Sequence, residues 1–143
     1  MDDSISLAPE RKEWARLREL IEAFSVKQGL SAELSASLQL IGEEWFINII
    51  MHGYKEPVPA EGPSQKIAFS ITRQPHDAIR LCFIDHAPPF DPLRRQAANI
   101  ELPADKRGIG GLGIHLIRSI ADECRYARKD GCNYFEMIKK IGE

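Results

Sequence analysis

The pattern of hydrophobic positions in the first half of the chain predicts a short strand followed by two helices. Residues 4–7 fit the strand, and apolar residues then recur at helical spacing until Gly29 ends the first helix. Ser31 is a favourable N-cap for a second helix, which we expect to run to about His52, where Gly53 ends it. The apolar positions that define the first helix are Trp14, Leu17, Leu20, Ile21 and Phe24.

The second half of the chain has the alternation that is typical of strands. A half-buried strand is predicted at 67–72 and a more buried one at 79–84, with a turn between them. Strands are also predicted at 124–128 and 133–141. The dipeptide Asp130-Gly131 is a strong turn signal and joins these two into a hairpin.

Between these two hairpins the chain is less regular. Residues 92–98 fit a short helix, residues 99–107 a loop, and residues 112–121 an amphipathic helix. Helices grouped with a mostly antiparallel sheet indicate the α+β class, as a two-layer α/β sandwich with helices on one face of the sheet. We expect a single domain over residues 1–143.

Composition narrows the class of protein. With 143 residues, 43% of them hydrophobic, and a net charge of -2, the chain fits a globular domain and has no basic run typical of nucleic-acid binding. Three cysteines without a CxxC pair argue against a disulfide framework or a zinc site. Without a signal peptide or an apolar run of about 18 residues, the expected location is the cytoplasm, away from membranes.

Two polar residues interrupt the apolar pattern of the second helix. At about 100° per residue, Glu44 and Asn48 share a gap between two apolar arcs, one of which includes Trp45. An unpaired buried carboxylate costs several kcal/mol, so this face must meet something polar. Either Glu44 pairs with a cation from elsewhere and Asn48 caps a loop, or the face borders a ligand pocket.

Each of the two side chains suits a particular chemistry. A carboxylate such as Glu44 can act as a general base toward a hydroxyl group. The side-chain oxygen of Asn48 is a hard neutral ligand for Mg²⁺, which takes the rest of its shell from water and phosphates. Downstream, Asp85 ends an apolar strand and could accept a hydrogen bond from an exocyclic amine, or could simply form a turn.

Glycines precede the last predicted helix. They let the backbone approach a ligand, and the helix N-terminus offers N–H groups to phosphates, although glycine-rich linkers also occur. A dinucleotide-binding unit is not indicated, because these glycines follow a long loop and not a strand. The glycines are Gly108, Gly110, Gly111 and Gly113.

Three segments in this order, E-x-x-x-N followed by H-G-Y, D-x-A-P-P-F-D, and G-x-G-G-L-G-I-H-L, resemble the N, G1 and G2 boxes of the GHKL ATPase superfamily. The segments PPFDP and GGLGIHLIRSIADE resemble the corresponding sequences in one branch of this superfamily, the anti-sigma-factor serine kinases. The resemblance implies a Bergerat fold and a Mg-ATP-dependent serine protein kinase. Such a kinase phosphorylates a small anti-sigma-factor antagonist, sequesters a sigma factor, and acts as a homodimer without direct nucleic-acid contact.

The resemblance also implies roles for individual residues. Glu44 would be the general base, Asn48 would bind Mg²⁺ at the ATP phosphates, and Asp85 would contact the adenine amino group. The lid and phosphate cradle would comprise Gly108, Gly110, Gly111, Leu112 and Gly113.

Two positions depart from the pattern of the branch. Ala87 replaces a glycine of the G1 box and would be strained if the position requires a positive φ. Glu136 stands where a threonine often helps to bind adenine, and it would bring a second negative charge near Asp85. These departures motivate an alternative, a nucleotide-gated protein-binding switch with little or no kinase activity. A third hypothesis is an ATPase that hydrolyses the nucleotide.

Overall fold

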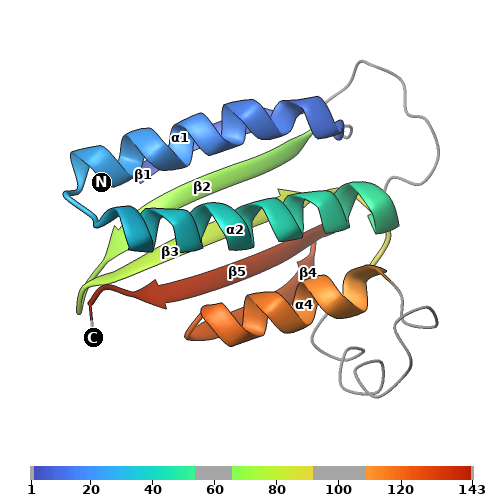
Figure 1. Ribbon diagram of the computed structural model, residues 1–143. Helices are drawn as coiled ribbons and strands as arrows, with labels where there is room; N and C mark the ends of the chain where they lie inside the picture. The colour runs from blue at the N-terminus through green and yellow to red at the C-terminus, as the bar shows by residue number, and fades with distance from the viewer. Residues whose placement is uncertain (1, 54–65, 92–108, 143) are drawn as a thin grey trace.

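A computed structural model describes residues 2–53, 66–91 and 109–142 of the chain. It contains one antiparallel sheet of five strands in the order β1-β2-β3-β5-β4. Figure 1 shows the helices packed side by side on one face of this sheet, which confirms the expected two-layer α+β sandwich. The strands are β1 (Asp2–Leu7), β2 (Ile67–Gln74), β3 (Ala78–Asp85), β4 (Glu123–Lys129) and β5 (Cys132–Lys140).

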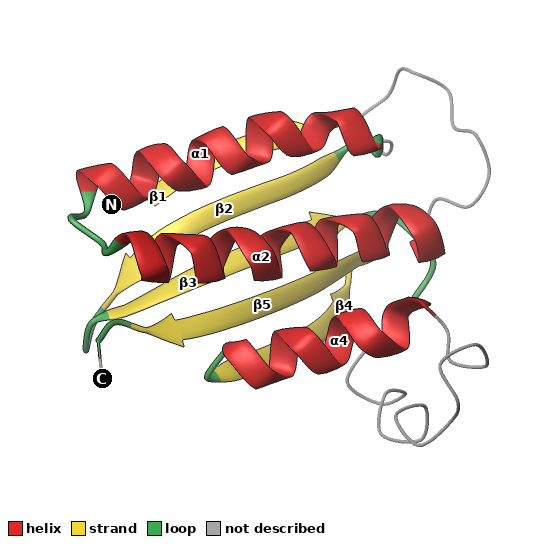
Figure 2. Ribbon diagram, in the orientation of Figure 1, coloured by secondary structure: helices red, strands yellow, loops and turns green. Residues whose placement is uncertain are grey.

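The described helices form the second layer, coloured red in Figure 2. They are α1 (Trp14–Lys27), preceded by a 3-10 turn (Arg11–Glu13), then α2 (Ala32–Asn48), which continues as a π-helical turn (Ile49–Gly53), and α4 (Ile109–Ile120). The predicted cap of α2 is confirmed, because the Ser31 side chain accepts a hydrogen bond from the backbone N–H of Leu34 at 3.0 Å. None of these helices is long and apolar enough to cross a membrane.

Helix α2 occupies the middle of the helical layer. It packs against α1 on one side and against α4 on the other (Figure 1). Its buried stripe of Leu38, Ile41, Trp45 and Ile49 recurs at three- and four-residue intervals, and a helix buries a face of this kind against a sheet. Helices α1 and α4 and the π-helical turn therefore all contact α2.

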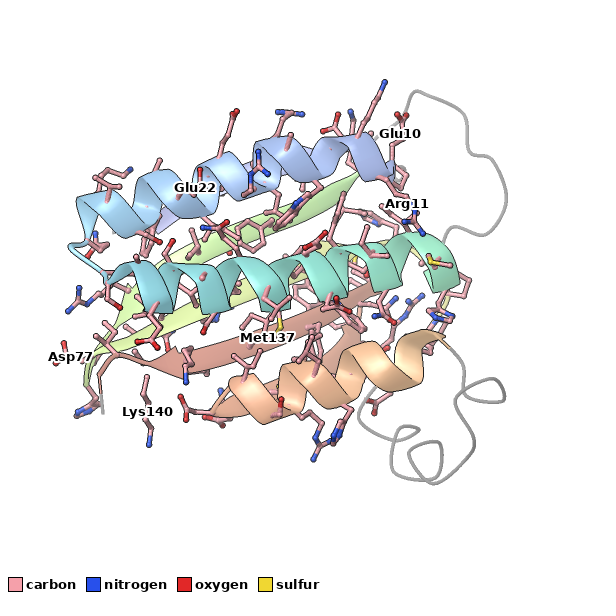
Figure 3. All side chains as sticks on the ribbon, viewed as in Figure 1. Glu10, Arg11, Glu22, Asp77, Met137 and Lys140 are labelled. Carbon is pink, nitrogen blue, oxygen red and sulfur yellow. The ribbon has the colours of Figure 1, made fainter. Side chains whose placement is uncertain are left out.

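The core lies between the two layers. Burial alternates along β5, whereas most residues of β3 are buried, as the sequence predicts for the more buried of the two strands in the first hairpin. Figure 3 shows Met137 of β5 in the space between α2 and the sheet, whereas Asp77 and Lys140 lie at the edge of the molecule. Core side chains that these strands contribute include Leu81, Phe83, Phe135 and Met137.

Both predicted hairpins are present. The β2–β3 turn places His76 and Asp77 at positive φ, and the β4–β5 turn does the same for Asp130 and Gly131, with φ of 55° and 77°. Two consecutive positive φ angles are typical of the two-residue turn that Asp-Gly favours. The Asp-Gly signal therefore placed this hairpin correctly.

The glycine-rich segment differs from its prediction. Helix α4 begins at Ile109, three residues before the expected start at Leu112, so Gly110, Gly111 and Gly113 lie within its first turns and not in a loop. The helix tolerates them because its remaining residues pack firmly: Ile114 and Ile117 are buried in the core. Gly108, the predicted helix 92–98 and the predicted loop 99–107 lie outside the described residues.

The core predicts a clear difference between two substitutions. Leu81 on β3 is fully buried, so Leu81→Ala should reduce the free energy of unfolding by about 2–5 kcal/mol through lost burial and a cavity. Val26 on α1 is 80% exposed, so Val26→Ala is the matched control and should change stability by less than about 0.5 kcal/mol. Urea unfolding followed by circular dichroism measures both. Equal losses from the two variants would contradict this account of the core.

Candidate functional site

The polar pair predicted on the second helix lies where α2 meets α4. Gly113, in the second turn of α4, packs against it: a Cβ built at this position would lie 2.6 Å from Asn48 Nδ2 and 3.1 Å from Glu44 Oε1. The first distance is shorter than real Cβ atoms show, so it could be relieved only by moving Asn48, and the second is an unusually tight contact. A glycine is therefore required for the start of α4 to reach the polar pair.

Asn48 is buried, with 2% of its surface exposed. Its side-chain Nδ2 donates a hydrogen bond to the backbone carbonyl of Glu44, one helical turn earlier, at 3.0 Å. The other side-chain atom, Oδ1, is buried and has no hydrogen-bond partner among the described residues. Leaving a buried acceptor unsatisfied costs about 1–3 kcal/mol, so this oxygen is oriented and available for a ligand or a cation.

Glu44 lies beside Asn48 and is partly buried. Burial raises the pKa of its carboxyl group above the usual value for glutamate, and the neighbouring charge of Glu43 raises it further. No Lys, Arg or His within the described ranges forms an ion pair with Glu44. Of the two interpretations left open by the sequence, the described part of the chain therefore favours a pocket over an internal ion pair.

Asp85 forms a second polar group at the end of β3, where it is 3% exposed. Its Oδ1 accepts a hydrogen bond from the backbone N–H of Ala87 and another from Asn133 Nδ2, both at 2.9 Å. Burial raises the pKa of the Asp85 carboxyl group, and these two hydrogen bonds partly oppose that rise because they stabilise the ionised form. The carboxylate is thus held in a fixed orientation.

Asn133 on β5 was not predicted, although it organises this end of the site. Its amide is the cross-strand partner of Asp85, and Nδ2 also lies within hydrogen-bond distance of the carbonyls of Ala87 at 3.2 Å and Pro88 at 3.1 Å. Its Oδ1 accepts a hydrogen bond from the Tyr126 hydroxyl, and Arg128 donates to the Ala87 carbonyl at 2.7 Å. Four side chains from three strands therefore fix the segment that follows Asp85.

Ala87 fits the site without backbone strain. Among the described non-glycine residues, those with positive φ are His76, Asp77 and Asp130, so Ala87 does not need the left-handed conformation that a glycine would provide. Its buried methyl group instead packs against Gly53: a Cβ built on Gly53 would lie 2.7 Å from the Ala87 Cβ. The Ala87 methyl group, which a glycine at position 87 would lack, has room because Gly53, at the end of the π-helical turn, carries no side chain.

An aromatic cluster lies against these polar groups. The indole ring of Trp45 packs on Phe135 with a centroid distance of 4.3 Å, and it is nearly parallel to Phe90 at 6.3 Å. Phe90 also stacks on His52, in the π-helical turn, at 5.6 Å. A small recess of about 10 Å³, room for about one water molecule, lies among these side chains, and its walls include Trp45, Asn48, Asp85, Ala87, Phe90 and Asn133.

The prediction that Glu136 contacts a bound base does not fit the structure. In β5, Asn133 faces the helices, so Glu136, three residues later, faces the opposite side of the sheet. There it pairs with Arg80 at 2.6 Å, and its cross-strand partner on β3 is Cys82. The residue of β5 beside Asp85 is Asn133, so no second carboxylate approaches Asp85 from this strand.

The glycine segment contributes backbone to the same region. Gly110, Gly111 and Leu112 belong to the first turn of α4, whose N–H groups have no partners within the helix and favour anions. Within residues 2–53, 66–91 and 109–142 no group of three or more His, Cys, Asp or Glu side chains could hold a metal ion. A cation held by Asn48 would therefore need most of its ligands from water or from a bound anion.

Comparison with known proteins agrees with this architecture. The family model described as histidine kinase-like ATPase domain matches residues 7–139. The serine/threonine-protein kinase BtrW of Bordetella bronchiseptica is 26% identical over 118 residues, which cover 82% of this chain and 78% of that protein.

A solved structure shares the fold. The structure of the RsbU and RsbW domains of Rv1364c from Mycobacterium tuberculosis superposes with a TM-score of 0.70 at 14% identity. The match covers all of this chain but only 33% of that one, so the chain spans about a third of that protein. The expected histidine kinase-like fold is confirmed.

The close approach of α4 to α2 can be tested by adding one methyl group. Gly113→Ala places that methyl against Asn48 and Glu44, and overpacking of this kind should reduce the free energy of unfolding by about 1–3 kcal/mol. It should also shift the Asn48 side-chain amide resonances. Ser119→Ala, at an exposed position of the same helix, is the matched control and should leave both unchanged. An unperturbed Asn48 amide in Gly113→Ala would show that the helices are farther apart than described.

Proposed function

Because the chain belongs to the family of histidine kinase-like ATPase domains, we propose that it is a Mg-ATP-dependent serine protein kinase. In this proposal it phosphorylates a small anti-sigma-factor antagonist and sequesters a sigma factor, acting as a cytoplasmic homodimer. The relative named as a serine/threonine-protein kinase supports the reaction class. Family membership itself implies ATP binding.

The observation that carries this proposal is the polar pair on α2. Glu44 has no cation beside it in the described part of the chain, and the Oδ1 atom of Asn48 has no hydrogen-bond partner there. Gly113 brings the N-terminal turns of α4 against both. A base, a cation ligand and an anion-binding helix terminus are the groups that phosphoryl transfer requires, since its catalysis is mostly positioning and charge stabilisation.

The residues present fit Mg²⁺ and ATP. The unsatisfied Oδ1 of Asn48 is a hard neutral oxygen, and the first turn of α4 offers N–H groups to phosphates. Asp85, held by Asn133 and Ala87, is an acceptor suited to an amino group. Bound Mg²⁺ would supply charge neutralisation at the phosphates.

The mechanism assigns Glu44 the proton transfer. Its carboxylate would accept the proton from the serine hydroxyl of the substrate as the serine oxygen bonds to the γ-phosphorus of ATP, the bond from that phosphorus to the bridging oxygen breaks, and ADP leaves. The raised pKa of Glu44 makes it a stronger base than an ordinary glutamate at neutral pH. Asn48 would hold the cation, because the hydrogen bond from its Nδ2 to the Glu44 carbonyl leaves Oδ1 free to bind it. Asp85, fixed by its hydrogen bonds from Asn133 and Ala87, would accept from the amino group of the base.

The alternative, a nucleotide-gated switch without kinase activity, was suggested by two departures from the family pattern, and neither disturbs the site. Ala87 is unstrained, and Glu136 is paired with Arg80 on the opposite face of the sheet. A binding module needs no general base, whereas Glu44, the base in this proposal, lies beside Asn48 and Gly113. These observations support the kinase over the switch.

Two neighbouring glutamates provide a matched test of the general base. Glu44→Gln should retain binding of ATP and lower phosphate transfer by about 10²–10⁴-fold, because the amide cannot accept the proton. Glu43→Gln changes the adjacent residue in the same way and should retain transfer at pH 8. Isothermal titration calorimetry measures binding, and labelled ATP with a co-purified antagonist protein measures transfer. Undiminished transfer by Glu44→Gln would remove Glu44 from the mechanism.

The pH dependence of transfer should report the same group. Glu44 must be ionised to act as a base, so the rate should fall as pH decreases through its pKa, at a higher pH than for an ordinary glutamate. Glu43→Gln removes the neighbouring negative charge that helps to raise this pKa, so the acid limb should move to lower pH. The measurement is kcat/KM against pH for both proteins. If the acid limb of the pH profile of Glu43→Gln stays in place or moves to higher pH, Glu44 is not the group that titrates.

A further inference from the structure

A thiol and an imidazole meet at the end of the sheet. The Sγ atom of Cys132, the first residue of β5, lies 3.4 Å from Nδ1 of His86, which follows β3. The two residues are 46 positions apart in the sequence, and they meet because the next pair of positions, Asp85 and Asn133, are cross-strand partners. At this distance the sulfur and the ring nitrogen can share a hydrogen bond, whose donor is set by the tautomer of the ring.

The pair belongs to the face of the sheet that points away from the helices. Asn133 faces the helical layer, and successive residues of a strand point to opposite faces, so Cys132 points to the other side. The described helices pack on the opposite face, as Figure 2 shows. His86 is exposed and Cys132 is half-buried, so the pair lies at the surface and apart from Glu44 and the polar groups of α2.

The three cysteines of the chain have different surroundings. Cys82 is 3% exposed, and burial raises the pKa of its thiol group. Burial also raises the pKa of the Cys124 thiol group. In the described part of the chain, Cys132 alone has its sulfur against a histidine ring. Because a protonated, buried thiol is a poor nucleophile, Cys82 and Cys124 serve as internal references for Cys132.

Lys129 adds a positive charge on the same face. It is the cross-strand partner of Cys132 in the β4–β5 hairpin, and paired residues share a face of the sheet. Its Nζ lies 5.5 Å from the centroid of the Tyr134 ring, two positions after Cys132 and therefore also on this face. Reactive cysteines typically have electropositive, partly exposed surroundings. An ammonium group here also favours a small reactant that carries negative charge.

We propose that Cys132 and His86 form a thiol modification site for anionic low-molecular-weight disulfides. His86 Nδ1 accepts the proton of the thiol as the Cys132 sulfur attacks one sulfur of the disulfide. A bond forms between these two sulfurs, the original S–S bond breaks, and the released thiolate takes the proton from the imidazolium. Cys132 is thereby oxidised to a mixed disulfide, and the other half of the reactant is reduced to a thiol. This proposal is independent of nucleotide binding.

His86 is the residue that distinguishes an activated thiol from one that is merely exposed. A half-buried cysteine without a base would react at a rate set by its accessibility, and changing a neighbouring histidine would not alter that rate. His86→Gln retains a polar side chain but cannot take a proton at neutral pH. His115→Gln, on the exposed side of α4, is the matched control.

The test exposes the full, reduced chain to an excess of oxidised glutathione at pH 7. Intact-protein mass spectrometry follows the gain of one glutathione, and peptide mapping locates it. Cys132 should be modified at least about tenfold faster than Cys82 or Cys124. His86→Gln should slow the modification of Cys132 by about tenfold, and His115→Gln should leave its rate unchanged.

Unfolding the wild-type chain in urea provides a test that needs no variant. Unfolding separates Cys132 from His86, so Cys132 should react more slowly in urea than in the folded protein, whereas Cys82 and Cys124 should react faster once exposed. A first adduct on Cys82 or Cys124, or a Cys132 that reacts no faster when folded, overturns the site. A wild-type rate in folded His86→Gln, verified by circular dichroism, overturns the role of the imidazole.

Discussion

The fold depends on the packing of α2, which must bury one face on the sheet and still present unsatisfied polar groups to one side. Its stripe of Leu38, Ile41, Trp45 and Ile49 supplies the burial, and α1 and α4 pack along its two sides. Burial of this size stabilises the helix by far more than one unsatisfied carbonyl or one desolvated carboxylate costs. Within the described ranges the Glu44 carboxyl group can therefore stay without a cation, and Asn48 Oδ1 without a donor, because the helix that carries them is anchored by other residues. Gly113 completes the arrangement by letting α4 reach the pair.

The second constraint is the register of β3 and β5. Pairing of Asp85 with Asn133 places a carboxylate and an amide side by side at the end of the sheet, and the amide then holds the carbonyls of Ala87 and Pro88. The π-helical turn that ends α2 brings Gly53 against Ala87 from the other layer. π-Helical turns are frequent at functional sites, and here the turn brings the helical layer into contact with the segment that follows β3. The site is thus built by both layers, and neither layer contains it alone.

The sequence predicted the elements well because each depends on local pattern. Helical spacing, strand alternation and the Asp-Gly turn are properties of neighbouring residues, and Glu44, Asn48 and Asp85 were recognisable as polar residues within apolar segments. The sequence predictions that failed concern contacts between residues that are distant in the chain. Alternation shows that Asn133 and Glu136 lie on opposite faces of β5, but only the pairing with β3 shows that Asn133 is the neighbour of Asp85. The ease with which Ala87 is accommodated depends on Gly53, 34 positions earlier, so no local pattern contains it.

The unsatisfied atoms of the site bear on its chemistry as a group. Trp45 Nε1 and Asn48 Oδ1 lie three positions apart on α2, next to the Glu44 carboxyl group, whose pKa is raised by burial. Buried polar groups are nearly always satisfied, so two such atoms on one helical turn, beside a desolvated carboxyl group, are improbable as independent defects of packing. Under the proposed function, Asn48 Oδ1 would serve the cation and the Glu44 carboxyl group the reacting hydroxyl of one bound substrate complex. A buried polar atom without a partner lowers the stability of the free protein, so a ligand that satisfies it should stabilise the folded chain.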